Sequence, residues 1–499
     1  MAGWPGWRTA GLAAACGAAM ATGQAPVGAW FVTLAALAAL LGLVARQQGV
    51  AAAAYVGWFA GAGYFALALN WIVEPFFVDI ARDGWMAPFA PVLMAFGLGG
   101  FWAAAGALAG GSRRPVAAMV LGLGLAELAR GYVLTGFPWA LIGHVWIATP
   151  VAQAAALIGP SGLTLLTLWL AAGLAGLVPP GLAEARQRQT WRGGLVAGAA
   201  LLLVWAFGAW QLARPDPALQ GATVRLVQPN AAQAVKWDPD LARRWFDRLM
   251  AATSAAPPVD LVIWPETALP YLLDPDLARR IGGAANGATV AVGMQRVDGR
   301  QAWNTLVVLA PDGSRLASYD KHHLVPFGEY LPFGDLLFDW LGISAFASKA
   351  GQGYTPGPGP RVLDLGPTLG RVLPLICYEA VFPQGLRGAG RPDWLLQVTN
   401  DAWFGRWTGP FQHAAQARLR AIEQGLPLVR VANTGVTVVY DARGREVAAL
   451  PFQTVGALDV AVPGALPATI YARWGEGPVG LLLAGLGLWL MRHNRRNPA

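Results

Sequence analysis

Long apolar runs separated by short polar loops occupy the first 211 residues. An α-helix needs about 20 apolar residues to cross a bilayer, and most of these runs approach or reach that length. A shorter apolar run lies at 478–491. The pattern predicts a polytopic helical membrane bundle with about seven spans at 1–211 and one more span at 477–491, about eight spans in all. The candidate spans are 9–23, 27–45, 50–73, 87–109, 115–136, 150–178, 193–211 and 478–491.

Between residues 222 and 463 the pattern changes to short apolar segments that end in turns or polar residues. Helical patterns separate these segments, and alternating strands and helices predict a layered α/β domain over 222–463. Polar residues gather where the expected strands end, as binding sites in α/β folds usually do. The expected strands are 222–230, 260–266, 287–294, 304–313, 371–377, 393–401, 428–435 and 436–444, the expected helices are 239–254, 274–284, 379–388 and 410–425, and hairpin turns are expected at 311–313 and 441–444.

The composition supports the membrane assignment. Hydrophobic residues make up 55% of the chain and charged residues 13%, whereas soluble proteins carry about 25% charged residues. The mean hydropathy is +0.43. These values fit a membrane bundle joined to one sizeable globular domain.

Basic residues between the apolar runs indicate the orientation. The net charge of +8 alone would suggest a nucleic-acid partner. The arginines, however, cluster in alternate loops, and the other loops of the bundle carry almost no Lys or Arg apart from Arg82. The positive-inside rule places the arginine loops in the cytoplasm and 212–476 on the opposite face, which in a bacterium would be the periplasmic or outer side. We expect no nucleic-acid binding. The clustered arginines are Arg8, Arg46, Arg113, Arg114, Arg186, Arg188, Arg192, Arg492, Arg495 and Arg496.

Cysteine and histidine usage excludes two common kinds of site. Two cysteines, Cys16 and Cys377, do not make a disulfide framework. His322 and His323 are adjacent, so an extended strand would point them to opposite faces, and we expect no metal or other cofactor. The apolar stretch before Cys16 is only about seven residues long and continues past it, which disfavours a cleaved signal peptide.

Two charged residues lie inside an expected span. Glu127 and Arg130 are three residues apart and share one helical face. Charges at membrane depth are costly and are usually paired or functional. The sequence leaves two interpretations open, a local ion pair and a contact to a lipid head group.

Ionisable groups follow three of the apolar strands. Glu266 ends the first, Lys321 and then Glu329 follow the second, and Cys377 ends the third. A cysteine attacks an acyl carbon as the thiolate, so it needs a base or a cationic neighbour. A carboxylate accepts the thiol proton, a lysine stabilises thiolate and oxyanion, and the N–H after the cysteine, that of Tyr378, completes an oxyanion hole. Glu329 would hold the lysine in place.

These residues lie in motifs that resemble the nitrilase, or carbon–nitrogen hydrolase, superfamily, whose catalytic triad is Glu, Lys and Cys in that order. In its fusion to membrane spans the chain resembles the apolipoprotein N-acyltransferase family. The resemblance covers essentially the whole chain, and the motif around Lys321 is long and specific. The motifs are QPN and KWD within 228–238, WPETALP at 264–270, DKHHLVPFGEYLP at 320–332, ICYEAVFP at 376–383, TNDAWFG at 399–405, ANTG at 432–435 and TGFPW at 135–139.

The resemblance implies an αββα sandwich for the α/β domain and a role for each matched residue. Glu266 would be the general base, Lys321 the oxyanion and thiolate partner, and Cys377 the nucleophile. Residues at matched positions that would support the triad are Glu329, Tyr378 and Glu379. Residues expected near the substrate are Trp237, Asn400 and Trp403, with Asp401 beside them; structural roles are expected for His413 and Glu423.

The same resemblance implies a reaction. An acyl chain would pass from a phospholipid to Cys377 as a thioester, and then to the N-terminal amine of a diacylglyceryl-cysteine lipoprotein. Apolar loops such as 331–350 would keep water out of the pocket. Two alternatives stay open on the sequence: a membrane-tethered nitrilase or amidase that hydrolyses a small amide, and a non-catalytic transporter or scaffold.

Overall fold

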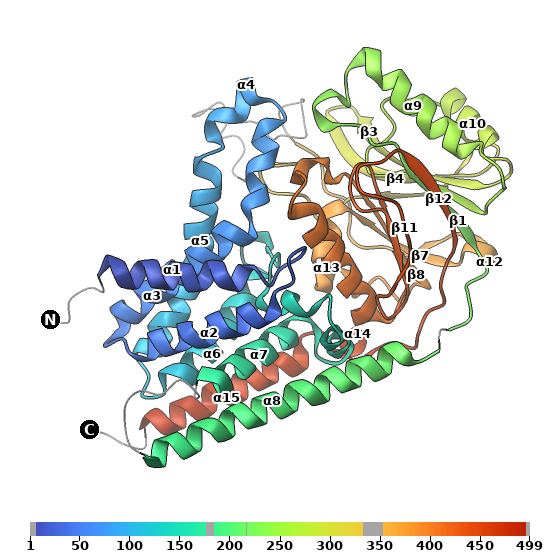
Figure 1. Cartoon of the computed structure of the whole chain (residues 1–499). Coiled ribbons are helices and arrows are strands. Elements are labelled where there is room, and N and C mark those ends of the chain that lie inside the picture. The colour runs from blue at the N-terminus through green and yellow to red at the C-terminus, as the bar shows by residue number, and fades with distance from the viewer. Residues whose placement is uncertain (1–5, 176–183, 216, 333–352, 496–499) are drawn as a thin grey trace. The chain divides into compact units, whose positions relative to one another are not determined.

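A computed structural model of the chain describes residues 6–175, 184–215, 217–332 and 353–495. The chain divides into two compact units, whose elements are labelled in Figure 1. The first comprises Met1–Arg214, Trp407–Ala415 and Ala468–Ala499, and the second Pro215–Arg406 and Gln416–Pro467. The expected loop 331–350 lies almost entirely outside the described residues.

The first unit is helical, and an apolar helix lies at each position where the sequence predicts a span. Four described helical stretches are long and apolar enough to cross a membrane: Val50–Ala68, Ile80–Gly110, Pro150–Ala175 and Arg192–Ala213. The number of about eight spans therefore stays a prediction. The helices are α1 (Trp7–Ala21), α2 (Trp30–Ala45), α3 (Val50–Ala68), α4 (Ile80–Asp83), α5 (Phe89–Gly110), α6 (Pro115–Arg130), α7 (Ala155–Ala175), α8 (Glu184–Ala213), α14 (Ile470–Trp474) and α15 (Gly477–Arg495), with 3-10 turns η1 (Asn70–Phe77), η2 (Gly84–Met86), η3 (Val133–Thr135), η4 (Ile142–Trp146) and η5 (Pro150–Ala154).

Helices α3 and α5 pack closely through small residues. A Cβ atom at Gly57 would lie 2.3 Å from the carbonyl oxygen of Trp102, and one at Gly106 would lie 2.2 Å from that of Ala53. Only glycine allows the two backbones this approach. Small residues at such contacts are typical of helices that pack in membranes.

The charged pair inside α6 is a local ion pair. Arg130 Nη2 donates to Glu127 Oε2 at 2.7 Å, and both side chains are buried. Arg130 Nη1 also donates to the carbonyl oxygens of Phe137 and Trp139. Trp102 Nε1 donates to the other oxygen of Glu127. Because protein groups take up these atoms, the structure favours the ion pair over a lipid head-group contact.

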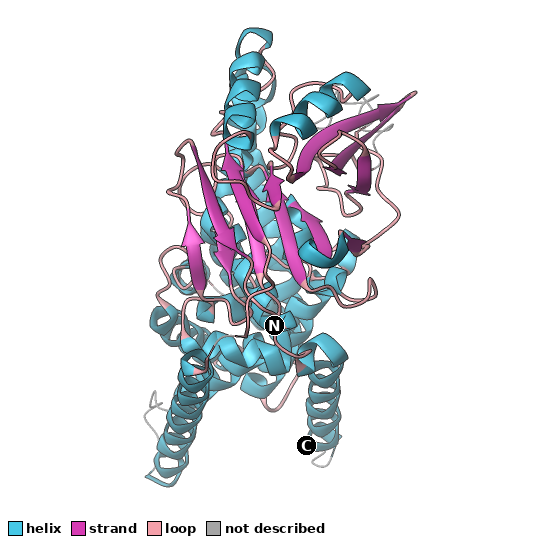
Figure 2. Ribbon diagram, turned by 90° about the vertical axis from the view of Figure 1, so that its right-hand side faces the viewer, coloured by secondary structure: helices cyan, strands magenta, loops and turns pink. Residues whose placement is uncertain are grey.

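The second unit contains two six-stranded sheets, drawn in magenta in Figure 2. In the first sheet the order is β12-β1-β2-β3-β4-β5, and in the second β11-β10-β9-β8-β7-β6. Each sheet has a parallel centre, β1-β2-β3 and β7-β8-β9, flanked by antiparallel strands. The strands are β1 (Thr223–Gln228), β2 (Leu261–Ile263), β3 (Thr289–Asp298), β4 (Gln301–Leu309), β5 (Arg315–Asp320), β6 (Leu363–Asp364), β7 (Arg371–Ile376), β8 (Trp394–Thr399), β9 (Leu428–Ala432), β10 (Val438–Tyr440), β11 (Glu446–Ala449) and β12 (Gly456–Ala461).

Alternation along the strands builds three apolar layers. In β2, Leu261 and Ile263 face the core between the sheets, while Val262 faces the opposite side. Helices α9 (Pro239–Thr253) and α10 (Pro275–Ala284) cover that side of the first sheet. Ala417 and Ala421 of α13 (Gly409–Gln424) pack against the outer side of the second sheet. This order of layers confirms the predicted αββα sandwich.

The strands that the sequence pattern missed lie at or next to the sheet edges. They are β6, β11 and β12, and their partly exposed positions leave no continuous apolar run. Strand β5 ends directly before Lys321, where the sequence predicts the end of a strand. Strand β12 is held to β1 by an ion pair of 2.6 Å between Arg225 Nη2 and Asp459 Oδ2. The stretch 379–388, expected as one helix, instead forms two short 3-10 turns, η7 (Cys377–Val381) and η8 (Pro383–Leu386).

Candidate active site

The three strand ends singled out in the sequence meet in the second unit. Glu266 follows β2 and Lys321 follows β5, both in the first sheet, while Cys377 follows β7 in the second. Lys321 Nζ lies 3.6 Å from Glu266 Oε1 and donates to Glu329 Oε1 at 2.9 Å. All four side chains are buried. The structure therefore brings these predicted residues together.

Asn304 joins the two carboxylates. Its Nδ2 atom donates to Glu266 Oε1 at 2.7 Å and to Glu329 Oε1 at 3.2 Å. The residue lies in β4 and is buried. The sequence analysis did not predict a role for Asn304. The feature that could have indicated one is an amide side chain at the start of the expected apolar strand 304–313.

The turn that carries Glu266 is fixed on several sides. Its Oε2 atom accepts a hydrogen bond of 2.8 Å from the backbone N–H of Asn400. Thr267 has a positive φ of 45°, a conformation that costs a residue with a Cβ atom energy. A Cβ atom at Gly293 would lie 2.1 Å from the Pro265 carbonyl oxygen. Residue 293 in β3 must therefore be glycine, because the turn that carries Glu266 passes directly over it.

Cys377 lies at a sharp turn between β7 and η7. Its φ is +52°, in the left-handed region that residues other than glycine rarely adopt. Gln397 Nε2 donates to its carbonyl oxygen at 3.1 Å. Thr399, whose side chain bonds the Cys377 thiol, also donates to Asp401 Oδ1 at 3.0 Å. These bonds hold the turn at the ends of two neighbouring strands.

Asp401 is held in turn by a buried arginine. Arg430 Nη2 lies 2.9 Å from Asp401 Oδ2 and 3.0 Å from Oδ1, and neither side chain reaches solvent. A buried charge requires such a partner, because an unpaired ion in a protein interior costs several kcal/mol, on the order of 3–5. Asp401 therefore has a structural role in this geometry.

Glu379 connects the cysteine turn to the lysine segment. Its carboxylate accepts hydrogen bonds from the backbone N–H groups of Ile376, at 2.7 Å, and His322, at 2.8 Å. Tyr319 Oη donates to the same carboxylate at 3.1 Å. These residues flank Cys377 and Lys321. Glu379 thus fixes the segment around Cys377 relative to the segment around Lys321. These hydrogen bonds go to neighbours of Lys321 and not to Lys321 itself.

The remaining predicted residues lie around this group. Asn400 bonds Glu266 directly, and its Nδ2 donates to Gln233 Oε1 at 2.6 Å. The ring of buried Tyr378 packs against Phe382 with 4.9 Å between centroids. Trp237 and Trp403 are both partly exposed, the latter on η9 (Asp401–Phe404). Trp403 follows Asn400 by three residues along the backbone.

Two residues expected to be structural lie on α13 and are fully buried. The ring of His413 stacks on that of Trp139 in the first unit, with 5.4 Å between centroids. Glu423 accepts a hydrogen bond of 2.7 Å from Arg420 in the second unit. Both arrangements agree with packing roles.

Burial and charge set the protonation of the group. Burial by itself lowers the pKa of Lys321, but the Glu329 and Glu266 carboxylates outweigh it and raise that pKa above its ordinary value. Burial, aided by Glu266, raises the pKa of Glu329 despite the opposing Lys321 charge. Burial and then the Glu266 charge raise the pKa of the Cys377 thiol. At neutral pH the lysine is charged and the cysteine is a thiol with a carboxylate nearby.

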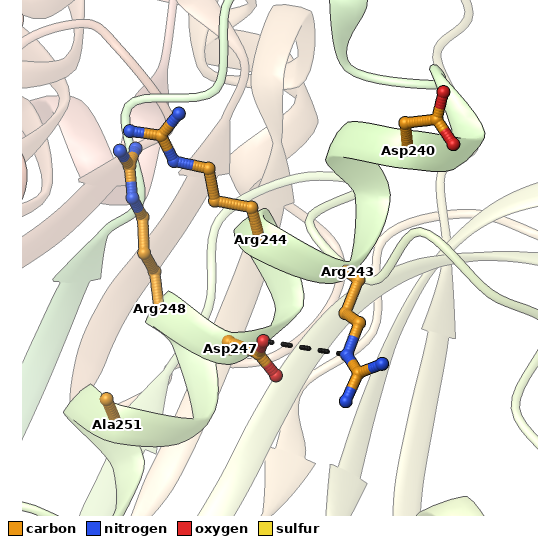
Figure 3. Close-up of a pocket in the computed structure, with 6 residues that line it drawn as sticks. All are labelled: Asp240, Arg243, Arg244, Asp247, Arg248 and Ala251. Carbon is orange, nitrogen blue, oxygen red and sulfur yellow. Dashed lines mark ion pairs between the residues drawn. The ribbon is translucent and has the colours of Figure 1, made fainter.

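Other kinds of site find less support. Among the described residues, no group of three or more His, Cys, Asp or Glu side chains is arranged to hold a metal ion. A surface hollow of about 470 Å³ lies along α9, between arginines and aspartates (Figure 3). An ion pair in this hollow, Arg243 with Asp247 at 3.9 Å, is exposed and contributes little. This hollow contains none of the triad residues.

A two-sheet sandwich with Glu, Lys and Cys at its strand ends defines a carbon–nitrogen hydrolase domain. The family described as Carbon-nitrogen hydrolase matches residues 223–470, and the Apolipoprotein N-acyltransferase N-terminal domain matches residues 16–174. A CN-hydrolase superfamily protein from Xanthomonas campestris, with an arsenic adduct in its active site, is a solved structure with 20% identity and a TM-score of 0.36; it covers 48% of this chain and 90% of its own.

Relatives that match nearly the full length of the chain identify the family more closely. An apolipoprotein N-acyltransferase from Bradyrhizobium diazoefficiens is 38% identical over 525 residues, which covers 99% of this chain and 97% of the relative. One from Caulobacter vibrioides is 38% identical, covering 94% and 92%. The chain belongs to the apolipoprotein N-acyltransferase family.

The charges around Cys377 predict opposite effects of two substitutions on its reactivity. Glu266→Gln removes the charge that raises the Cys377 pKa, so alkylation by iodoacetamide at mildly alkaline pH becomes several-fold faster. Lys321→Met removes the charge that lowers this pKa, so alkylation becomes slower. Peptide mass spectrometry measures both rates, with Cys16 as the internal reference. A shift of both variants in the same direction would contradict this electrostatic description.

The two bonds made by Asn304 predict a large effect on catalysis. Asn304→Ala removes one hydrogen-bond donor from each of two buried carboxylates, and N-acylation becomes about 10- to 100-fold slower, since a hydrogen bond to a charged group contributes about 1.5–3 kcal/mol. The assay is transfer of a labelled acyl chain to a lipopeptide amine. Gln301→Ala, at the exposed start of the same strand, is the matched control. A wild-type rate in Asn304→Ala would refute the role of this amide.

Proposed function

We propose that this chain transfers an acyl chain from a phospholipid to the N-terminal amine of diacylglyceryl-cysteine apolipoproteins, through a thioester on Cys377. Lipoprotein N-acylation is the activity named for its full-length relatives. The observation that supports the chemistry is the buried contact of Lys321 with the Glu266 and Glu329 carboxylates, at the strand ends where Cys377 lies.

In the first half-reaction the Cys377 thiol attacks the ester carbonyl of the phospholipid. Glu266 accepts the thiol proton as the S–C bond forms, so a free thiolate does not accumulate in the resting site. Lys321 and the backbone N–H of Tyr378 stabilise the oxyanion of the tetrahedral intermediate. The C–O bond then breaks, Glu266 returns the proton to the leaving oxygen, and lyso-phospholipid departs from the acyl-enzyme.

In the second half-reaction the neutral α-amine of the lipoprotein attacks the thioester. Glu266 takes a proton from the attacking nitrogen, the C–S bond breaks, and the cysteine sulfur recovers a proton from Glu266. The product is an amide, which is more stable than the thioester, so the step runs downhill. Both half-reactions use one site in turn, which gives ping-pong kinetics.

The surrounding residues support this cycle. Glu329 and Asn304 keep Lys321 and Glu266 in place, and Glu379 fixes the Cys377 turn to the lysine segment. Asn400 orients Glu266 through its backbone N–H. Trp237 and Trp403, which are partly exposed, contact the substrate. No cofactor takes part in this scheme.

The proposed setting is the bacterial inner membrane. The bundle at 1–211 and the span at 477–491 hold the catalytic domain at 222–463 on the periplasmic side, where acyl donor and lipoprotein share the bilayer. The arginine-rich loops support this orientation through the positive-inside rule. Hydrolysis competes with transfer to the amine, so the acyl-enzyme has to exclude water.

Phospholipid supplied without lipoprotein should leave one acyl chain on Cys377. Intact-mass spectrometry of the purified protein detects the adduct, and peptide mapping assigns it. Addition of a lipopeptide with a free N-terminal amine removes the adduct and yields the N-acyl product. Cys377→Ala forms none, and Cys377→Ser forms almost none, because a serine hydroxyl is far harder to ionise.

The outcomes separate the alternatives. Full activity in Cys377→Ala would refute the covalent route. Release of free fatty acid at the same rate with and without the amine would identify a hydrolase. A wild-type protein that forms no adduct and loses nothing on alkylation of Cys377 would indicate a binding module or transporter.

Orientation is testable with single cysteines in a variant that carries Cys16→Ala and Cys377→Ala. Arg300→Cys, at the exposed turn between β3 and β4, should react with a membrane-impermeant maleimide in intact spheroplasts. Arg113→Cys, in the loop between α5 and α6, should react only after lysis. The reverse pattern of labelling would overturn the proposed orientation.

A further inference from the structure

Lys236 is a second buried lysine beside the general base. It follows η6 (Gln233–Val235), and its side chain turns inward while Trp237 stays partly exposed and Asp238 is exposed. Its Nζ atom donates to Thr267 Oγ1 at 2.9 Å and to the Glu266 carbonyl oxygen at 3.3 Å. The ammonium group therefore binds the strained turn that carries Glu266, at the residue with positive φ.

A second contact joins the same segment to Glu266. Gln233 accepts a hydrogen bond of 2.6 Å from the Asn400 side chain, and the backbone N–H of Asn400 donates to Glu266 at 2.8 Å. Lys236 Nζ also lies 5.4 Å from the centre of the Trp237 ring. The segment 233–237 is thus connected to the general base at both of its ends, and it carries the tryptophan proposed to contact the substrate.

The charges around Lys236 explain why a positive group belongs there. It faces Glu266, and beyond that carboxylate lie Lys321 and Glu329. With Lys236 charged, two ammonium groups balance two carboxylates. Burial, opposed by the Glu266 charge, lowers the pKa of Lys236 to about 8. Below this pH the site is balanced, and above it the site carries one excess negative charge, which opposes a developing oxyanion.

The use of lysine at this position stands out against the rest of the chain. Only three of the 36 basic residues are lysines, and two of these, Lys236 and Lys321, are buried around Glu266. Arginine would stay charged at every relevant pH, whereas a buried lysine loses its proton readily. The residue type thus makes the charge at this position sensitive to pH.

We propose that Lys236 is a positioning residue for acyl transfer, which fixes the Glu266 turn to the Trp237 segment and supplies the second positive charge of the site. The inference rests on the proposed function. Binding of the acyl donor at Trp237 is then coupled to the position of the general base through one ammonium group.

The first half-reaction isolates the effect of this charge. The rate of acyl-Cys377 formation is measured with phospholipid alone, across neutral and alkaline pH, because the lipoprotein amine would add its own titration. The wild-type rate falls as the pH rises through about 8. In Lys236→Arg the side chain stays positively charged, so the rate does not fall as the pH rises through about 8. Lys236→Met is about 10-fold slower at neutral pH, since a charged donor is lost, and also lacks the fall.

A surface variant controls for the loss of a positive charge. Arg243→Met, on the exposed face of α9, keeps the wild-type rate and pH profile. A wild-type rate and profile in Lys236→Met overturns the proposal and leaves the acyl-transfer mechanism standing. If the rate of acyl-Cys377 formation in Lys236→Arg also falls near pH 8, as in the wild type, the titration of Lys236 does not cause that fall.

Hydrogen exchange tests the positioning without any substrate. The amides of Ala268 and Leu269 donate to the carbonyl oxygens of Pro265 and Gly293 and so report on the Glu266 turn. Their exchange becomes faster in Lys236→Met than in the wild type, and unchanged exchange overturns the proposal. A third outcome is possible: exchange is faster in Lys236→Met, but the wild type forms no acyl adduct on Cys377. That outcome would support the positioning role of Lys236 and refute the proposed function.

Discussion

The Lys321 ammonium group, buried between the Glu266 and Glu329 carboxylates, is the interaction on which the catalytic unit depends. Each of these charges would be costly to bury alone. Together they require the ends of β2 and β5 to meet, and the second sheet to place Cys377 at the same point. The αββα sandwich satisfies this requirement, because residues of both sheets share one apolar core directly beneath these strand ends.

The balance of charge explains how a buried cysteine can be both stable and reactive. A resting thiolate would be buried and would add a negative charge next to Glu266, and the raised pKa of Cys377 reflects the burial first and this charge second. The proton therefore moves to Glu266 as the sulfur attacks. Lys321, and Lys236 in the proposed scheme, offset the negative charge that then develops on the oxyanion.

Two of the strained backbone positions in this unit lie where the chemistry is. Thr267 and Cys377 both adopt positive φ, and each turn is held by side chains from other elements: Lys236 at the first, Gln397 at the second. Such conformations persist only where the surrounding structure over-determines them. Gly293 serves the same end, because it lets the Glu266 turn lie directly on β3.

Local patterns along the chain were enough to predict the apolar helices, the buried strands, and the ionisable residues at strand ends, among them Glu266, Lys321 and Cys377. The edge strands β6, β11 and β12 were not predicted, because partly exposed strands show no apolar run. Only the tertiary structure revealed the roles of Asn304 and Lys236. An amide in an apolar strand and a lysine before a helix look ordinary along the chain. What they bind is decided by segments 25 or more residues away, as the bond from Lys236 to Thr267 illustrates.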